Sequence, residues 1–170
     1  MNKISIPIEF ELTPRSRALM EAVAKALPPE RLGDDEVSSV QTPARQGQPP
    51  AIGIRWAEHN GIYAGVARGY RDEKDVHLIL LDDKPEGKLS WADAVKWAES
   101  LGGGASLPTR FESALLYANL NGHMDATEWH WTGTQYSDYE AWLQHFSYGG
   151  QSNTDKSFEA RCRAVRRFAL

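Results

Sequence analysis

The histidines, the cysteine and the carboxylates beside them are the groups in this sequence that could perform acid–base, nucleophilic or metal chemistry. His123 lies two residues before Asp125, and His130 lies two residues after Glu128, so either pair could bind zinc or move a proton. No HExxH, GxSxG or paired-cysteine spacing accompanies them. Cys162, the single cysteine, falls in a predicted closing strand, and we interpret it as a small buried side chain. The sequence therefore predicts a protein that is not an enzyme and holds no metal or cofactor.

Two further stretches resemble ligand-binding loops but are better explained as structure. The acidic residues between Glu30 and Glu36 lack the fixed turn geometry of a calcium loop, and we interpret them as solvated side chains. The segment GGGASLPT before the helix at residue 110 lacks the Lys-Ser/Thr ending of a nucleotide loop. Its glycines are interpreted as a chain reversal.

Residues 135–155 favour recognition rather than catalysis. Tyrosine and tryptophan supply a large contact area at low entropic cost, while serine, asparagine and glutamine supply adaptable hydrogen bonds. Aromatic faces also stack on sugar rings, with amides reading the hydroxyl groups. The predicted ligand-binding residues lie in or beside the two turns that flank the strand YEAWLQHF: Tyr136, Asp138, Tyr139, His145, Tyr148, Gln151 and Asn153.

An alternative stays open, in which the aromatic residues of this region build the core instead. In a strand, successive side chains point to opposite faces. One face of residues 139–148 would carry Tyr139, Ala141, Leu143, His145 and Ser147. The other face would carry Glu140, Trp142, Gln144, Phe146 and Tyr148. The pattern leaves open which face is buried.

Three short apolar runs open the main domain, which we place at residues 51–170. AIGIRW, IYAGVARG and VHLILL are separated by Asn60-Gly61 and by the charged turn 71–75, a pattern typical of antiparallel strands. The continuous apolar run from Leu78 to Leu81 predicts a central strand that is covered on both faces.

Two amphipathic helices should follow these strands. Ser90 is a predicted N-cap, and Trp91, Ala94, Val95 and Ala98 share one face up to Gly102. Thr109 is the second N-cap, with Glu112 at the capping-box position. The side chains expected to bury this second helix are Leu115, Leu116, Ala118 and Leu120. These elements define an α+β fold in which two helices pack on an antiparallel sheet.

The N-terminal residues read as an appendage to this domain. Residues 1–28 predict an alternating strand from Lys3 to Leu12 and an amphipathic helix from Pro14 to Leu27, and the proline-rich residues 29–50 predict a linker. A strand and one helix cannot close a core alone, so this arm packs on the domain or on another subunit. We expect an anchor or oligomerisation element and a homo-oligomer, with a trimer favoured. Light scattering with and without residues 1–28 tests this expectation.

Composition narrows the range of partners. The 170-residue chain has a formal net charge of -4, which gives no general basic surface for nucleic acid. No apolar run approaches the roughly 20 residues that span a bilayer, so membrane insertion is not expected. The polar start MNKISIPIEFEL lacks the apolar region of a secretory signal, so we expect synthesis in the cytoplasm.

Five motifs together resemble a known family. They are the tryptophan of LSWADAV, the LPTRFE elbow, the paired aromatics of EWHWTGTQ, the YEAWLQHF strand and the closing RAVRRF, spread over residues 61–168. In this order they resemble the C-type-lectin-like domains of the Lcl C-terminal type, found in phage and bacterial proteins and distantly related to formylglycine-generating enzymes. The enzymatic relatives use a cysteine pair, so the lone Cys162 does not support that chemistry.

The resemblance implies a C-type lectin fold that serves as a binding platform. We therefore expect a phage or prophage protein on the virion, associated with the tail, that binds a host-surface glycan, a protein receptor or neighbouring virion proteins. The alternative is an accessory protein of the host cytoplasm that binds a host or defence protein through the same surface.

Overall fold

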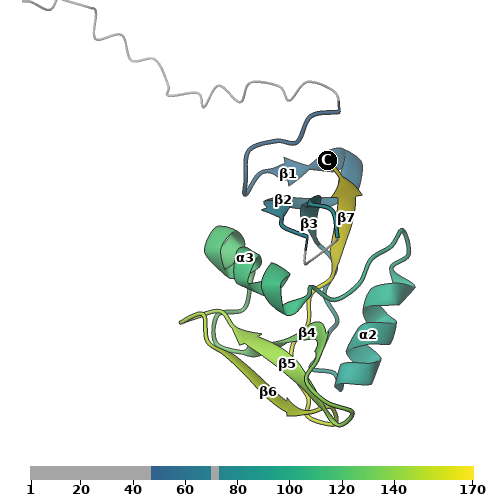
Figure 1. The fold of residues 1–170 in the computed structure, drawn as a ribbon, viewed down its shortest axis with the longest axis vertical. Helices are drawn as coiled ribbons and strands as arrows, with labels where there is room; N and C mark the ends of the chain where they lie inside the picture. The colour runs from purple at the N-terminus through teal and green to yellow at the C-terminus, as the bar shows by residue number, and fades with distance from the viewer. Residues whose placement is uncertain (1–46, 70–72) are drawn as a thin grey trace, which may run out of the picture. The chain divides into compact units, whose positions relative to one another are not determined.

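The strand that carries Leu78 to Leu81 is the centre of one of two antiparallel sheets. The computed structural model describes residues 47–69 and 73–170, which fall within the unit Pro43–Leu170. The predicted arm at residues 1–28, and the linker at 29–50 as far as residue 46, lie outside the described residues. Among those described, the structure is α+β, with two α-helices and two antiparallel sheets (Figure 1). None of their helices is long and apolar enough to span a bilayer.

The first sheet has the strand order β1-β2-β3-β7. Its strands are β1 (Arg55–Trp56), β2 (Gly61–Ala67), β3 (Val76–Leu81) and β7 (Val165–Ala169). β3 pairs with β2 on one side and β7 on the other, and residues 78–81 are almost fully buried. The central strand is therefore confirmed. The strand predicted from AIGIRW is shorter than expected, because residues 51–54 form a turn in which the Ile54 N–H donates to the Ala51 carbonyl.

The second sheet has the order β4-β5-β6 and forms the lower part of the domain in Figure 1. Its strands are β4 (Trp129–Gln135), β5 (Glu140–His145) and β6 (Gln151–Asp155). The chain then returns through two isolated bridges at Ala160 and Arg161 before entering β7. Cys162 lies in this return segment, so its predicted place within the closing strand is wrong, although it is buried as expected.

Both helices begin at the predicted caps. The Ser90 hydroxyl accepts the Asp93 N–H at the start of α2 (Trp91–Ser100), and Thr109 with Glu112 forms a complete capping box on α3 (Arg110–Leu120). Short 3-10 helices lie at Ala57–His59 and Asn121–His123. Ala118 does not help to bury α3 as predicted, because it lies on the solvent side of the helix.

Two apolar cores lie on opposite faces of β3. Ile79 and Leu81 pack with α2 and with Trp131 of the second sheet, whereas Leu78 and Leu80 pack under α3. The face of β5 that carries Ala141 and Leu143 is buried, because both side chains pack in the core that contains Ile79, Leu81 and Trp131, which we call the first core. The opposite face is covered at its far end by α3, where Gln144 and Phe146 are also buried. Only the end of that face near Trp142 remains partly open.

Candidate functional site

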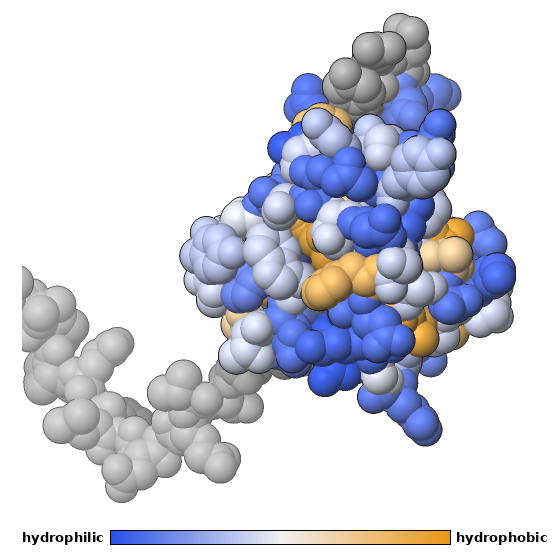
Figure 2. Space-filling model, turned by 90° about the horizontal axis from the view of Figure 1, so that it is seen from below, coloured by the Kyte–Doolittle hydropathy of each residue, from blue (hydrophilic) through white to orange (hydrophobic). Residues whose placement is uncertain are grey.

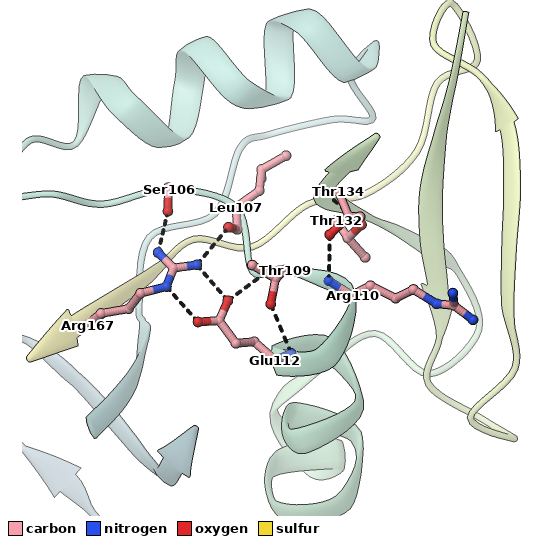
Figure 3. A network of polar contacts seen from close by, with 8 residues as sticks. All are labelled: Ser106, Leu107, Thr109, Arg110, Glu112, Thr132, Thr134 and Arg167. Atoms are coloured by element: carbon pink, nitrogen blue, oxygen red, sulfur yellow. Dashed lines mark hydrogen bonds and ion pairs between the residues drawn. The ribbon is translucent and has the colours of Figure 1, made fainter. Parts of the chain in front are cut away.

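A partly buried ion pair between Glu112 and Arg167 holds the start of α3 in place. The Glu112 carboxylate accepts the Thr109 N–H at 2.6 Å and two N–H groups of Arg167, each at 2.6 Å. Arg167 also donates to the Ser106 hydroxyl at 2.6 Å (Figure 3). Paired, charge-assisted bonds of this kind are the strong and geometrically specific ones. The first turn of the helix is therefore fixed to β7 and to the extended segment before it.

A bulge in β4 forms hydrogen bonds with Pro108 and Arg110 at the start of α3. The β4–β5 pairing shifts register between Trp131 and Gln135, which frees backbone groups from the ladder. The Gly133 N–H donates to the Pro108 carbonyl at 2.8 Å, and the Thr134 hydroxyl accepts the Arg110 N–H at 2.9 Å. In Figure 3 the Arg110 side chain points away from the Glu112–Arg167 pair and toward the strands of the second sheet.

Arg110 and Trp142, both half-buried, form the centre of a partly exposed face, which we call the Trp142 face. The guanidinium carbon of Arg110 lies 3.6 Å from the centroid of the Trp142 ring, and its Nε donates to Gln151 at 2.5 Å. Tyr136 meets the edge of the same ring, with centroids 5.4 Å apart. The two terminal nitrogens of Arg110 and the indole N–H of Trp142 donate to no described residue. The face thus combines an aromatic ring with unused hydrogen-bond donors.

The amides at the border of the Trp142 face are bound within the domain. Gln151 donates to the Arg110 carbonyl and to the buried Gln144 side chain, both at 2.8 Å. Asn153, opposite Trp142 in the ladder, donates to Glu140 at 3.1 Å. Gln151 therefore supports the fold as well as the surface, because removing it leaves the buried Gln144 oxygen without this donor.

The tip of the β4–β5 hairpin presents Asp138 and Tyr139. Tyr139 is 77% exposed, and Asp138 is also exposed. The Lys156 ammonium binds the carbonyls of Ser137 and Asp138 at 3.0 and 2.8 Å, so the turn is tied to the chain that follows β6. An ordered turn lowers the entropic cost of binding through its tip.

His145 and Tyr148 belong to a second cluster, at the other end of β5. Their rings stack with centroids 4.5 Å apart, and Trp129 meets His145 at 5.0 Å. Gly149 has a φ of 75°, and a Cβ there would meet the Tyr117 ring at 2.6 Å, so glycine is needed to shape this turn. Trp142 and His145 are three residues apart in β5, so their side chains point to opposite faces of the strand and their Cα atoms lie roughly 10 Å apart. The seven predicted residues therefore do not form a single patch.

The surface of this end of the domain is mainly hydrophilic. Seen from below, hydrophobic side chains appear only in small separate areas (Figure 2). The exposed aromatic residues include Tyr136, which is 57% exposed, and Tyr148, which is 62% exposed, together with Phe111 and Phe158. Recognition here would therefore rely on aromatic rings and polar groups rather than on a large aliphatic patch.

The groups with potential for catalysis are placed elsewhere. Burial raises the pKa of the Cys162 thiol to about 12, which keeps it protonated at neutral pH. Burial also lowers the pKa of His130 to about 4, so the imidazole is neutral. Within residues 47–69 and 73–170, no group of three or more His, Cys, Asp or Glu side chains is placed to hold a metal ion.

Sequence reasoning missed Arg110 and left Trp142 out of the predicted site. Arg110 contacts Trp142 across 32 positions of sequence, and nothing local to either residue signals the contact. The sequence pattern places Trp142 on the same face of β5 as Gln144 and Phe146 but does not predict which of these side chains are exposed. The packing of α3 buries Gln144 and Phe146 and leaves Trp142 partly exposed.

No protein-family model matches the chain, and no curated protein shows significant similarity to it. The resemblance to C-type-lectin-like domains accordingly depends on the five motifs alone.

Proposed function

We propose that this chain is a phage or prophage virion protein, associated with the tail, whose lectin-like domain binds a host-surface glycan through the Trp142 face. The observation that carries the proposal is the Trp142 ring framed by Arg110 and Tyr136, with the indole N–H and two guanidinium nitrogens unused by the described residues. Because the Arg110 guanidinium covers one face of the Trp142 ring, the exposed Tyr136 ring beside it is the surface on which the C–H groups of a sugar could stack. The unused donors would then meet the hydroxyl oxygens at the rim of the sugar.

A protein partner is the second candidate, and a separate observation favours it. The exposed tyrosines Tyr139 and Tyr148 stand on two hairpin turns, and tyrosine on ordered loops is typical of protein-binding surfaces. Such a partner could be a receptor or a neighbouring virion protein, or a host or defence protein if the chain acts in the host cytoplasm. In that proposal the N-terminal arm anchors a homo-oligomer, with a trimer favoured.

Variants at the two ends of β5 test the proposal. Tyr136→Ala should weaken adsorption to host cells, or binding on a glycan array, by roughly 1 to 3 kcal/mol if the ring is a hot spot. Because Tyr136 is mostly exposed, its loss should change the free energy of unfolding by less than about 0.5 kcal/mol. Tyr148→Ala is the matched control, since it removes an equally exposed tyrosine from the second cluster.

Gln151→Ala is the third variant, and unlike Tyr136→Ala it should affect both folding and binding. It should lower both stability and binding, because it releases Arg110 and leaves a buried oxygen of Gln144 unpaired, at a cost of about 1 to 3 kcal/mol. Full binding by Tyr136→Ala and Gln151→Ala together would show that the Trp142 face is scaffold. Loss confined to Tyr148→Ala would move the site to the cluster around His145.

A further inference from the structure

A second concave site lies away from the Trp142 face, between the chain that follows β3 and the return segment before β7. Two adjoining cavities, of about 210 and 460 Å³, share Lys84, Asp125 and Arg163 as lining residues. The smaller is also lined by Pro85, His130, Arg161 and Cys162, and the larger by Ile62, Asp82, Gly122, His123 and Met124. We call the two together the Arg163 pocket, and it shares no residue with the Trp142 face.

Arg163 is a buried cation that forms no ion pair with a carboxylate of the described residues. The residue is 6% exposed, and its terminal nitrogens donate to two backbone carbonyls, those of His123 at 2.8 Å and Leu81 at 2.7 Å. Its Nε is buried and bonds to no described residue. Burial lowers the pKa of Arg163, while the charges of Asp82 and Asp83 act in the opposite direction. Asp82 forms its ion pair with Arg55, so it compensates the charge of Arg163 only through a longer-range electrostatic interaction.

Two further cations line the same pocket. The Nε of Arg161 is buried without a hydrogen bond, and the nearest carboxylate oxygen, on Asp125, lies 3.9 Å away. Lys84 contacts both cavities and forms no ion pair with a described residue, whereas nearby Lys88 is paired with Glu128 at 2.8 Å. Lys84, Arg161 and Arg163 thus converge on a space in which the shared carboxylate, Asp125, pairs with Arg161 only at 3.9 Å. Arginine binds carboxylates through two parallel N–H groups, so this excess of positive charge suits an anionic ligand.

Asp125 and His130 supply acceptors beside these cations. Hydrogen bonds from Thr127 to one oxygen of Asp125 hold the pKa of that carboxyl below its usual range, so it is charged. His130 Nδ1 lies 3.1 Å from the Glu128 carbonyl, which only accepts, so Nδ1 carries the proton. The neutral ring then keeps an acceptor at Nε2. A ligand for this pocket should therefore bring both an anionic group and a hydrogen-bond donor.

We propose that the Arg163 pocket binds a small hydroxycarboxylate. Arg161, Arg163 and Lys84 would hold the carboxylate, and Asp125 or His130 Nε2 would accept the hydrogen bond that the hydroxyl donates. A hydroxycarboxylate is preferred to inorganic phosphate because its hydroxyl places a hydrogen-bond donor opposite Asp125 and His130, where the additional oxygens of a phosphate would meet acceptors. The smaller cavity, at about 210 Å³, suits a molecule of a few non-hydrogen atoms rather than a cofactor.

The test is a titration of the full-length protein with sodium lactate, with sodium phosphate and sodium chloride as parallel arms at equal ionic strength. NMR signals of the His130 ring and of the arginine Nε–H groups report on the pocket. Lactate should produce saturable shifts with a Kd below about 10 mM, and phosphate should bind more weakly. Arg161→Gln should raise the lactate Kd about tenfold or more, because it removes one charge-assisted contact.

Two variants make the result decisive. Arg68→Gln is the matched control, since its side chain is 86% exposed and lies outside the pocket, and it should leave the lactate Kd unchanged. Lys84→Gln repeats the Arg161 test at an exposed residue if Arg161→Gln fails to fold. Absence of saturation with lactate, phosphate binding tighter than lactate, or a folded pocket variant with the original Kd would each overturn the proposal.

Discussion

Replacing Glu112 with alanine should lower the free energy of unfolding by about 3 kcal/mol. The carboxylate is 7% exposed and serves both the capping box of α3 and Arg167, so the substitution leaves a largely buried guanidinium without its partner. Removing one member of a buried pair typically costs 3 to 5 kcal/mol. We expect the low end of that range, because 28% of the Arg167 side chain remains exposed. Urea denaturation measures the change.

Two companion variants separate the ion pair from the helix cap. Glu112→Gln keeps an oxygen that can accept the Thr109 N–H but loses the charge, so it should cost less than alanine. Glu99→Ala, at an exposed glutamate of α2, should change stability by less than about 0.5 kcal/mol. A loss in Glu112→Ala no greater than in Glu99→Ala would contradict the view that this pair fixes the start of α3.

Replacing Trp131 with alanine should lower the free energy of unfolding by about 3 to 5 kcal/mol. The side chain is 1% exposed and lies in the core between α2 and the two sheets, so its loss opens a cavity there. Its indole N–H also donates to the Leu89 carbonyl at 2.9 Å. Thermal and urea unfolding measure the effect, and Tyr136→Ala is the control at an exposed aromatic residue five positions further along the chain.

Comparing Trp131→Ala with Tyr136→Ala distinguishes a core aromatic residue from a surface one in the same part of the chain. Ligand binding by folded Trp131→Ala should be retained, since the ring does not reach the Trp142 face. A destabilisation as small as that of Tyr136→Ala would mean that Trp131 is not a core residue, and the described packing of the first core would be wrong.

Local sequence patterns were sufficient for the helices and the central strand. The caps at Ser90 and Thr109 depend on residues within three positions, and the burial of residues 78–81 follows from an unbroken apolar run. Ala118 was misplaced because alanine is small and apolar enough to occupy either side of a helix. The lectin-like family remains a proposal from the motifs.

Long-range contacts explain what the sequence could not predict about the site. The turns that carry Tyr136 and Tyr148 were located from local composition, but their separation into two clusters depends on the register of β5. Arg110 reaches Trp142 only because the β4 bulge and the Glu112–Arg167 pair orient the start of α3. The Arg163 pocket likewise joins residues from four segments, which are Ile62 and residues 82–85, 122–130 and 161–163.

The most direct test of the central proposal is a titration of ¹⁵N-labelled protein with oligosaccharides released from the host surface, followed by the tryptophan indole signals. The indole N–H groups of Trp91 and Trp131 already donate to the carbonyls of Thr132 and Leu89, whereas that of Trp142 donates to no described residue. A glycan on the Trp142 face should therefore shift the Trp142 signal saturably and leave those of Trp91 and Trp131 in place. Saturable binding that leaves the Trp142 signal unmoved, or no binding at all, would contradict the proposal.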